Sequence, residues 1–280
     1  MPEHSVGQRI LVGLVVLIGL FPVLYFCSVE IGIAESGEDS TEIAQAGQQT
    51  FDRFVENVAF GVGEKLDFDI NYGFINAGTA SMEVVRMIEF ENRPCYQIVT
   101  RALSNRFFST FYRVDDRVES IVDALGIFSW RFEKTLREGN YRSDRSYTFD
   151  QRENVVLYEG DTIDVAPYVQ DALSILYYVR TQPLTVGEPI YLDNFTDGRK
   201  VELQVIVHRK ETITVEAGTF DCIVVEPIMQ SVGVFRHEGK LTVWLTDDNL
   251  KLPVLMKSKV VVGSISAELT NYRLGELWDY

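Results

Sequence analysis

The sequence predicts a mainly β protein in which one antiparallel sheet carries a single central helix. Hydrophobic and polar residues alternate over many short segments, as at Leu66, Phe68 and Ile70, and this is the period of a strand with one buried face. Turn-forming residues separate these segments at spacings typical of hairpins, which favours an antiparallel sheet over βαβ units. Only the segment 167–180 combines strong helical spacing with start and stop signals for a helix.

The composition is that of an ordinary folded protein with a sizeable core. Of the 280 residues, 46% are hydrophobic and 12% aromatic. The 41 acidic residues outnumber the 26 basic ones, so the net charge is −15. Such a chain is repelled by phosphate backbones, which excludes general nucleic-acid binding and argues against a broad polybasic surface for membranes. Three cysteines and three histidines are few ligands for a metal or redox centre, so we expect no cofactor.

The N-terminal segment predicts export. Residues 10–27, ILVGLVVLIGLFPVLYFC, carry no charge and follow Arg9, the layout of a secretory signal. Pro22 late in the run and a following small-x-small motif, GIA, favour a signal peptide over residues 1–34. The run also just reaches the length of a spanning helix, so an uncleaved signal-anchor helix stays open. Lipoprotein processing at Cys27 is less favoured, because a bulky residue precedes that cysteine.

The sequence predicts a spacer and one domain in the rest of the chain. Without residues 1–34 the chain has 25 basic and 39 acidic residues, a net charge of −14. Residues 35–50 are small, polar and acidic, which is typical of a flexible spacer. Residues 51–280 show neither an internal repeat nor a linker, so we expect a single β-rich domain there. At its start, helical spacing predicts a short amphipathic helix through Phe51, Phe54, Val55 and Val58.

The predicted strands lie on both sides of the central helix. Before it, they cover residues 64–71, 80–84, 96–100, 113–122, 128–136, 141–150 and 155–158. After it, they cover residues 189–192, 201–208, 213–215, 222–227, 241–245, 254–262 and 264–271. Polar and glycine-containing turns at 194–198, 217–219 and 247–249 separate paired strands.

The predicted central helix has the sequence PYVQDALSILYYVR, residues 167–180. Pro167 suits its first turn and Asp171 its N-terminal half, whereas Pro183 ends it. Its apolar residues recur at helical spacing: Val169, Leu173, Leu176, Tyr177 and Val179. We expect these to face the sheet.

Two cysteines follow the export segment, Cys95 and Cys222. In an oxidising compartment such a pair can form a disulfide that stabilises by ~2–4 kcal/mol. Both cysteines lie in strand-like apolar contexts, so two separate buried thiols explain them as well.

The best candidate for a binding surface is a basic and aromatic stretch over residues 101–152. Its arginines are Arg101, Arg106, Arg113, Arg117, Arg131, Arg137, Arg142, Arg145 and Arg152. Guanidinium groups bind carboxylate or phosphate bidentately and stack on rings, so on a concave sheet this stretch would suit an anionic amphiphile or a glycan. The candidate ligand-binding residues are Arg113, Arg145, Tyr112, Tyr147 and Trp130.

Alternation places Arg145 on the same strand face as Tyr147 and Phe149. This is the apolar face, where a lone charge needs a partner. In the alternative interpretation, the arginines pair with acidic residues of neighbouring strands on a solvated face. These partners would be Asp115, Asp116, Glu119, Glu133 and Asp144.

The sequence contains no catalytic motif. G-x-S-x-G, H-E-x-x-H, G-x-G-x-x-G and the P-loop pattern do not occur in it. The sequence places His208 in a strand-like context and predicts a hairpin turn at His237. Adjacent carboxylates such as Asp115 and Asp116 point to opposite faces of a strand, although carboxylate pairs can hydrolyse glycans. We expect that the protein is not an enzyme, and an envelope hydrolase is the least favoured alternative.

Several segments resemble the DUF3108 family of bacterial exported proteins. Residues 72–80, YGFINAGTA, resemble its early strand pair, and residues 171–180, DALSILYYVR, resemble its central helix. Later segments resemble it too: LTVGE at 184–188, EAGTFDC at 216–222, VWLTDD at 243–248, KLPV at 251–254 and GSI at 263–265. The resemblance extends over residues 62–272.

The resemblance implies an envelope protein with a strongly curved, largely antiparallel sheet that is half-open or barrel-like. It also implies a periplasmic location in a Gram-negative-type bacterium. The function of the family is unassigned, so the resemblance carries over no catalytic residue. Three shared charged residues, Asp171, Arg180 and Asp248, are explained by a cap, a salt bridge and a turn.

We therefore expect a non-catalytic envelope protein that binds or carries a lipid-like or glycan ligand. The alternative is a structural or protein-interaction module of the envelope, with membrane contact only through an uncleaved N-terminal segment. A large apolar cavity would favour the carrier, and a filled core with an exposed apolar patch would favour the module. Clustered carboxylates with perturbed pKa values in a cleft would favour the hydrolase.

Overall fold

The computed structural model describes residues 53–230, 241–259 and 263–279, and fourteen strands in these ranges form one antiparallel sheet. The first eight are β1 (Lys65–Tyr72), β2 (Ile75–Phe90), β3 (Arg93–Ser104), β4 (Asp115–Asp123), β5 (Ser129–Glu138), β6 (Tyr141–Asp150), β7 (Val155–Tyr158) and β8 (Asp161–Asp164). The others are β9 (Ile190–Thr196), β10 (Arg199–Val215), β11 (Gly218–Gln230), β12 (Leu241–Thr246), β13 (Pro253–Lys259) and β14 (Ser264–Arg273). A 3-10 turn, η1 (Phe108–Thr110), follows β3, and helix α2 (Ser174–Thr181) lies between β8 and β9.

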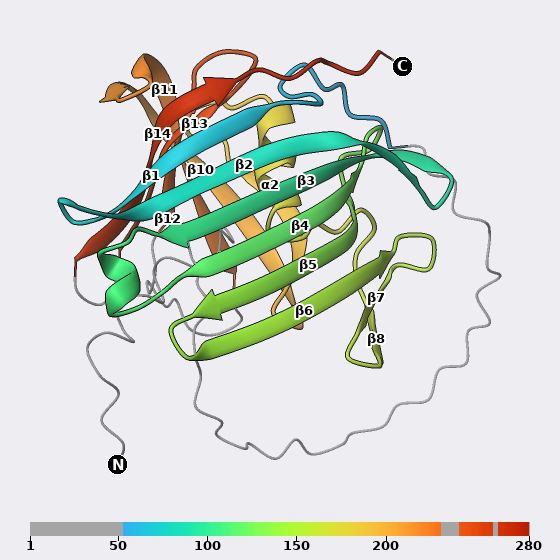
Figure 1. Ribbon diagram of the computed structural model, residues 1–280. Helices are drawn as coiled ribbons and strands as arrows, with labels where there is room; N and C mark the ends of the chain where they lie inside the picture. Colours follow the sequence, from blue (N-terminus) through green and yellow to red (C-terminus); the bar gives the residue numbers. More distant parts are fainter. Residues whose placement is uncertain (1–52, 231–240, 260–262, 280) are drawn as a thin grey trace.

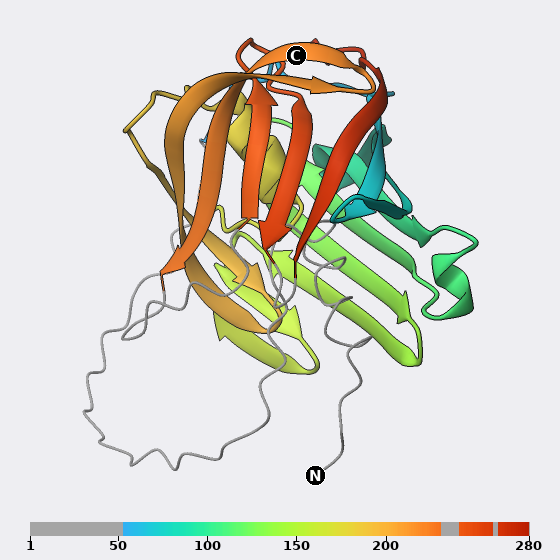
Figure 2. The same ribbon diagram turned by 90° about the vertical axis from the view of Figure 1, so that its left-hand side faces the viewer.

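The sheet has the strand order of an up-and-down barrel that is open at one place. Strands that follow each other in the chain pair, except β8 and β9, and β1 also pairs with β14. The opening lies between β8 and β9, which do not pair with each other in the described ranges and are connected through α2. Figures 1 and 2 show the strong curvature of the sheet. The predicted curved antiparallel sheet with one central helix is confirmed in its half-open form.

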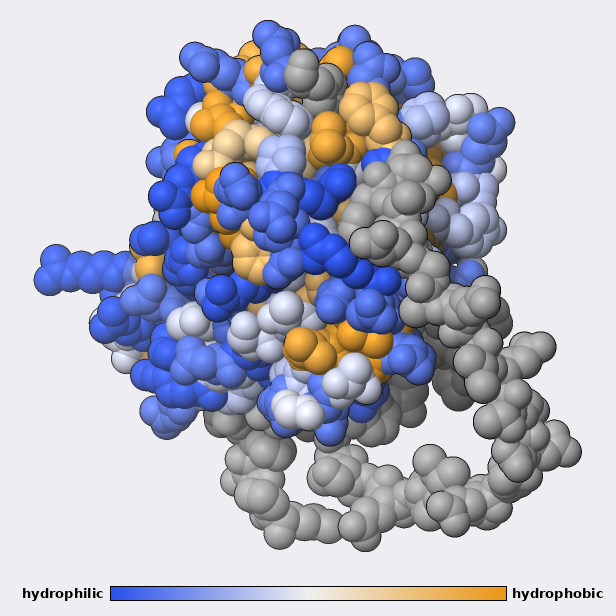
Figure 3. All heavy atoms as spheres, turned by 90° about the vertical axis from the view of Figure 1, so that its right-hand side faces the viewer, coloured by the Kyte–Doolittle hydropathy of each residue, from blue (hydrophilic) through white to orange (hydrophobic). Residues whose placement is uncertain are grey.

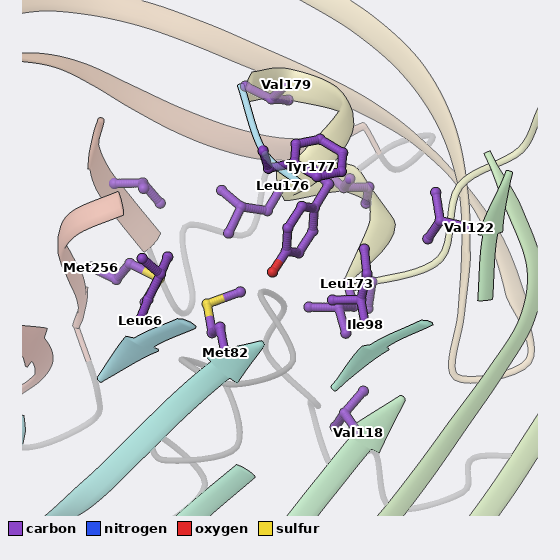
Figure 4. Close-up of a cluster of buried hydrophobic side chains, with 14 of the residues drawn as sticks. Leu66, Met82, Ile98, Val118, Val122, Leu173, Leu176, Tyr177, Val179 and Met256 are labelled. Carbon is purple, nitrogen blue, oxygen red and sulfur yellow. The ribbon is translucent and has the colours of Figure 1, made fainter. Parts of the chain in front are cut away.

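Helix α2 packs into the concave side of the sheet. Figure 4 shows Leu173, Leu176 and Tyr177 lying among side chains from both halves of the sheet, including Met82 of β2 and Met256 of β13. Each of these side chains is at least 96% buried, and burying one such side chain stabilises a fold by ~1.5–3 kcal/mol. The described part of the core is therefore filled by the protein's own side chains.

The alternation read from the sequence matches the burial of the strands. In β1, Leu66, Phe68 and Ile70 are buried, and their neighbours are half-exposed. Strands β2 and β3 extend well beyond the predicted 80–84 and 96–100, because their ladder continues where alternation fades. Residues 201–215 lie in one strand, β10, with a register shift between Val207 and Arg209 in place of the predicted break. Strand β8 was not predicted.

The central helix is shorter than its periodicity predicts, since it begins at Ser174 instead of Pro167. Gln170 is held in an extended conformation by β9: its backbone N–H donates to the Asp193 carbonyl at 2.9 Å. The carboxylate of Asp171 then accepts bonds from the backbone N–H groups of Leu173 and Ser174, at 2.7 and 2.8 Å. These bonds compete with helix formation until Ser174.

The amphipathic helix predicted at 51–58 is wrong for residues 53–58, which form no helix. The backbone N–H of Val55 donates to the Leu125 carbonyl at 2.8 Å. The Asn57 side chain forms a local turn by accepting bonds from the N–H groups of Ala59 and Phe60. Tertiary and side-chain bonds thus replace the helical ladder.

The predicted signal peptide or anchor (1–34), the lipoprotein site at Cys27 and the acidic spacer (35–50) lie outside the described residues, as does the predicted strand end at 260–262. In the part of the chain that the structure describes, no helix has the length and hydrophobicity to span a membrane.

Candidate functional site

Five side chains meet between the two halves of the sheet near its opening. We call them the seam cluster: Lys134, Arg145, Tyr147, Tyr158 and Asp197. The first four come from β5, β6 and β7, and Asp197 lies in the turn between β9 and β10. The seam cluster therefore connects the two halves of the sheet across the unpaired edge.

Asp197 is the charged centre of the seam cluster. Its Oδ1 atom lies 2.6 Å from Lys134 Nζ and 3.6 Å from Arg145 Nη1. Lys134 and Arg145 occupy opposite positions on adjacent strands, so both point to the same face of the sheet. The side chain of Lys134 is 7% exposed, whereas those of Arg145 and Asp197 are 30% and 26% exposed. Two cations thus share one carboxylate at a half-buried position.

Aromatic rings surround these charges. The ring centroid of Tyr147 lies 4.6 Å from that of Tyr158 and 5.5 Å from that of Phe195. Burial raises the pKa of both tyrosines, which keeps them protonated. Burial lowers the pKa of Arg145, but its contacts with Tyr147, Tyr158 and Asp197 outweigh that effect and raise the pKa overall. The cluster therefore holds fixed cations and neutral hydroxyl groups.

A pair of buried carboxyl groups, Asp116 of β4 and Glu138 of β5, lies in the same half of the sheet as Lys134 and Arg145. Their residues are 2% and 6% exposed. Asp116 accepts a bond from the backbone N–H of Arg137 at 2.7 Å. Burial raises the pKa of both carboxyl groups. Asp116 raises the pKa of Glu138 further, whereas the hydrogen bond with Glu138 lowers the pKa of Asp116. The pair is suited to holding one proton between two acids.

The structure brings together two of the five candidate ligand-binding residues, Arg145 and Tyr147, as their alternation predicts. Tyr112 lies by the carboxyl pair, where burial and the charges of Glu138 and Asp116 raise its pKa to about 12. Arg113 is 72% exposed and pairs with Asp115 at 3.3 Å. Trp130 is buried in a different cluster. The five residues therefore do not form one site.

Trp130 occupies the outer face of the sheet because of a β-bulge. The pairing of β4 with β5 shifts register beyond Ile121, so that Val122 lies opposite Ser129. Trp130 packs with Cys95, Ile121 and Phe128 in a cluster separate from the main core. Its indole N–H donates to Asp123 Oδ2 at 3.1 Å. A bulge reverses the face that alternation assigns, and the sequence does not reveal it.

Three of the other seven arginines of the 101–152 stretch pair with acidic residues that the alternative interpretation names, but only the pair of Arg137 with Asp144 joins neighbouring strands. Arg117 pairs with Glu119, Arg131 with Glu133, and Arg137 with Asp144. Arg152 pairs with Glu91, and Arg142 donates to backbone carbonyls. Arg101 and Arg106 form no ion pair with any residue that the structure describes.

The three charged residues shared with the resembled family have structural partners. Arg180 is fully buried and donates two bonds of 2.7 Å to the carboxylate of Glu64, with further bonds to two backbone carbonyls. Asp171 accepts bonds from the hydroxyl groups of Ser120 and Ser129. Asp248 accepts bonds within its turn.

The two cysteines are buried free thiols and do not form the disulfide that we considered. Cys95 lies in the cluster with Trp130, and Cys222 lies in another cluster with Val224, Trp244 and Val254. Burial raises the pKa of Cys95 to about 12 and that of Cys222 to about 11, which makes both poor nucleophiles.

The described residues contain no group of three or more metal-ligating side chains. His208 Nε2 lies 2.7 Å from Glu226 Oε2, and His237 lies outside the described residues. Sequence reasoning missed Lys134, Glu138 and Asp197 as site residues. Asp197 was assigned only to a turn, and its contact with Lys134, 63 residues earlier, leaves no local sequence signal.

The chain has matches among families and solved structures. A family model described as a protein of unknown function, DUF3108, matches residues 67–270. None of the curated proteins matches the chain. The chain is similar in structure to a β-barrel-like protein of Brucella abortus from the domain of unknown function DUF1849, with a TM-score of 0.57 and 11% identity, covering 78% of this chain and 100% of that one. This likeness supports the barrel-like fold alone.

Two weaker structural similarities follow. One is to a candidate lipoprotein of Parabacteroides distasonis, with a TM-score of 0.34 and 12% identity over 79% of this chain and 100% of that one. The other is to a candidate exported protein of Bacteroides fragilis with a YmcC-like fold, with a TM-score of 0.30 and 13% identity over 79% of this chain and 99% of that one.

Proposed function

This chain belongs to the DUF3108 family, whose model spans residues 67–270, and from that premise we propose that it is a non-catalytic binding protein of the cell envelope. Its ligand is an anionic lipid-like or glycan molecule, held at the seam cluster. The apolar run at 10–27 after Arg9 supports export to the periplasm.

The observation that carries the proposal is the charge balance of the seam cluster. Lys134 and Arg145 share the single carboxylate of Asp197, and Lys134 also lies near Glu138 of the carboxyl pair. The guanidinium group of Arg145, 3.6 Å from Asp197 Oδ1, is therefore the cation that a ligand can neutralise. A phosphate or carboxylate group can accept bidentate bonds from a guanidinium group. The ring of Tyr158 beside Arg145 can stack on a sugar or contact an acyl chain.

The position of the cluster also supports binding. It lies at the opening between β8 and β9, where the sheet leaves its own edge unpaired. Arg145 and Asp197 remain about one quarter to one third exposed, so a ligand can reach them from solvent. Lys134 is nearly buried, and a low dielectric strengthens its attraction for an anion.

Native mass spectrometry of the protein purified gently from its own envelope tests this proposal. We expect an additional mass that organic solvent removes from the wild-type protein. The variant Arg145→Gln keeps a hydrogen-bonding side chain but loses the charge, and it should lose that mass.

Arg137→Gln is the matched control, because Arg137 lies on the neighbouring strand but pairs with Asp144. It should retain the additional mass. A bare polypeptide mass for the wild-type protein under repeated mild conditions contradicts the proposal, as does an equal loss of mass in both variants.

A second candidate function, an envelope interaction module, is favoured by a specific pair of observations. The described core is filled by α2 (Figure 4), and several large apolar side chains are exposed at one end of the sheet, among them Phe74, Phe107 and Phe111. Exposed apolar groups of this kind mark interaction surfaces.

One observation supports the least favoured function, an envelope hydrolase: the carboxyl pair of Asp116 and Glu138. Raised pKa values in paired acids are a feature of catalytic sites. However, both residues are at least 94% buried, which limits access for a substrate. Release of soluble products from glycan fragments by the wild-type protein, and its loss in Glu138→Gln, would revive this function.

A further inference from the structure

Two loops at one end of the sheet expose apolar side chains that nothing in the seam cluster uses. Phe74 lies in the tight turn between β1 and β2 and is fully exposed. In the connection between β3 and β4, Phe107 and Phe111 are 64% and 70% exposed. Figure 1 shows both loops projecting on the left-hand side, and Figure 2 looks onto this end. We call these residues, with Ile75 and Leu103, the apolar rim.

The apolar rim is one surface because hydrogen bonds connect the two loops. Asn105 donates from its side chain to the Asn76 carbonyl at 2.7 Å. The backbone N–H of Asn105 donates to the Ala77 carbonyl at 2.9 Å. Phe107 and Phe111 also contact each other, with ring centroids 5.0 Å apart. The exposed rings are thus presented on a fixed scaffold.

The charge around the apolar rim is opposite to that of the whole protein. Residues 70–82 and 101–114 contain no acidic residue and three arginines, Arg101, Arg106 and Arg113, although the chain carries a net charge of −15. Only Arg113 has an acidic partner among the described residues. The two rim segments are therefore positive on a negative molecule, although Asp67 and Asp69 lie opposite Ser81 and Thr79 on the neighbouring strand β1, and this local charge favours contact with a negative surface.

A depression on the outer face continues from the apolar rim. It has a volume of about 330 Å³, and Leu103, Arg101, Thr79 and Ser81 line part of it. Leu103 lies opposite Thr79, and Arg101 lies opposite Ser81, on β3 and β2. A guanidinium group beside two hydroxyl groups is suited to a phosphate. Asp67, which pairs with Lys65, also lines the depression and lies opposite Ser81 on β1.

We propose that the apolar rim docks onto an anionic phospholipid bilayer, with the phenylalanine rings entering the interface and Arg101 and Arg106 contacting phosphate groups. Projecting rings flanked by cations, beside a depression lined by a guanidinium group and two hydroxyl groups, match the layered chemistry of a membrane surface. A protein partner would require a broader complementary patch. At the opposite end, Figure 3 shows hydrophobic residues in small groups between hydrophilic ones.

The test uses the full chain with tryptophan reporters. Because residues 10–27 are apolar enough to insert by themselves, binding alone does not report on the rim. Phe74→Trp and Phe107→Trp are mixed with vesicles of phosphatidylglycerol and phosphatidylethanolamine whose acyl chains are brominated. We expect emission from both reporters to shift to shorter wavelength and to be quenched by at least half.

The matched reporter is Leu157→Trp, since Leu157 is 45% exposed but lies on β7, away from the rim (Figure 1). Its emission should not change. Adding Arg101→Gln and Arg106→Gln to the Phe74→Trp reporter should raise the lipid concentration needed for half-maximal quenching by about fivefold for each arginine. Arg131→Gln, which removes a paired surface arginine, should not.

Two results would overturn the proposal. One is unquenched emission at positions 74 and 107 while the chain sediments with the vesicles, which would assign the rim to a protein partner. The other is equal quenching at position 157. Both outcomes are independent of the seam cluster, so they leave the ligand-binding proposal unaffected.

Discussion

The carboxyl groups of Asp116 and Glu138 lie in a setting where neither is well solvated. Both residues are almost fully buried on the concave side of β4 and β5. A second negative charge beside the first would be strongly disfavoured at this position. One proton held by the pair removes that cost, and Lys134 lies close enough to favour the remaining charge.

This arrangement makes stability depend on pH. Burial, with the charge of Asp116, raises the pKa of Glu138 to about 9 from an ordinary value of 4.5. Between these values the folded state keeps a proton that the unfolded chain has lost, so stability is greatest below the lower value and falls as the pH rises toward 9. We expect the free energy of unfolding to decrease by up to ~1.4 kcal/mol per pH unit in this window.

Chemical denaturation of wild type and Glu138→Gln between pH 5 and pH 9 measures the effect. The amide keeps the size of the side chain and cannot ionise, so most of the slope should disappear. Glu133→Gln changes an exposed, paired carboxylate and should leave the slope unchanged. An unaltered slope in Glu138→Gln would show that the pair does not retain its proton.

At the scale of single residues, the alternation of apolar and polar residues predicted which side chains share a face of a strand. It placed Arg145 and Tyr147 on one face, and both are in the seam cluster. Trp130, named as a candidate from its place in the basic and aromatic stretch, lies beside the bulge between β4 and β5 and packs in a separate cluster. Asp197 could not be found from the sequence, because its partner lies across the opening of the sheet.

One buried ion pair links helix α2 to the residue that precedes β1, in addition to the packing of the helix in the core. Arg180, in its last turn, binds Glu64 just before β1 and also donates to the carbonyls of Ala59 and Leu250. Each of the three guanidinium nitrogen atoms donates at least one bond, and such bonding is the condition under which a buried charge pair is tolerated. The pair therefore fixes the position of a helix of only eight residues.

Removing one partner of this pair should be costly. Arg180→Met leaves the Glu64 carboxylate buried without its cation, and we expect a loss of ~3–5 kcal/mol in the free energy of unfolding. Arg131→Met is the control, because the pair of Arg131 with Glu133 is solvent-exposed and should contribute at most ~1 kcal/mol. Equal losses in the two variants would contradict this role.

At the scale of elements, the strands were predictable and the start of the helix was not. Alternation reports burial on one face, and the ladder follows it in β1, β4 and β5. The apolar residues at 167–173 do have helical spacing. However, hydrogen bonds with β9 and with the Asp171 side chain prevent this segment from joining the helix. Gly78 shows a further contact invisible in the sequence: a Cβ atom there would lie 2.1 Å from the Leu103 carbonyl oxygen.

The whole molecule consists of two meanders, β1–β8 and β9–β14, that meet at two places. At one, β1 and β14 form a full ladder. At the other, side chains of the seam cluster replace a ladder, with Lys134 and Asp197 as the principal contact. The second junction has far fewer backbone bonds, so local opening should occur there first.

We expect Asp197→Asn to weaken this junction. The loss of ~1–2 kcal/mol in local stability should speed amide hydrogen exchange about 5–30-fold in the β9–β10 turn and the facing part of β6. Exchange across β1 and β14 should not change. Asp144→Asn, at an exposed pair on the same wing, serves as control, and unchanged exchange in Asp197→Asn would show that the seam holds without this charge.

The pairing of β1 with β14 has a consequence for the order in which the protein assembles. The hairpins within each meander join residues close in sequence, so they can form quickly. The junction of the meanders instead joins distant segments: Arg273 donates to the carbonyl of Gly63, 210 residues earlier. Until β14 is available, β1 has an unpaired edge in the middle of the finished sheet. The two halves can therefore unite only after β14 has been made, in a late and slow step.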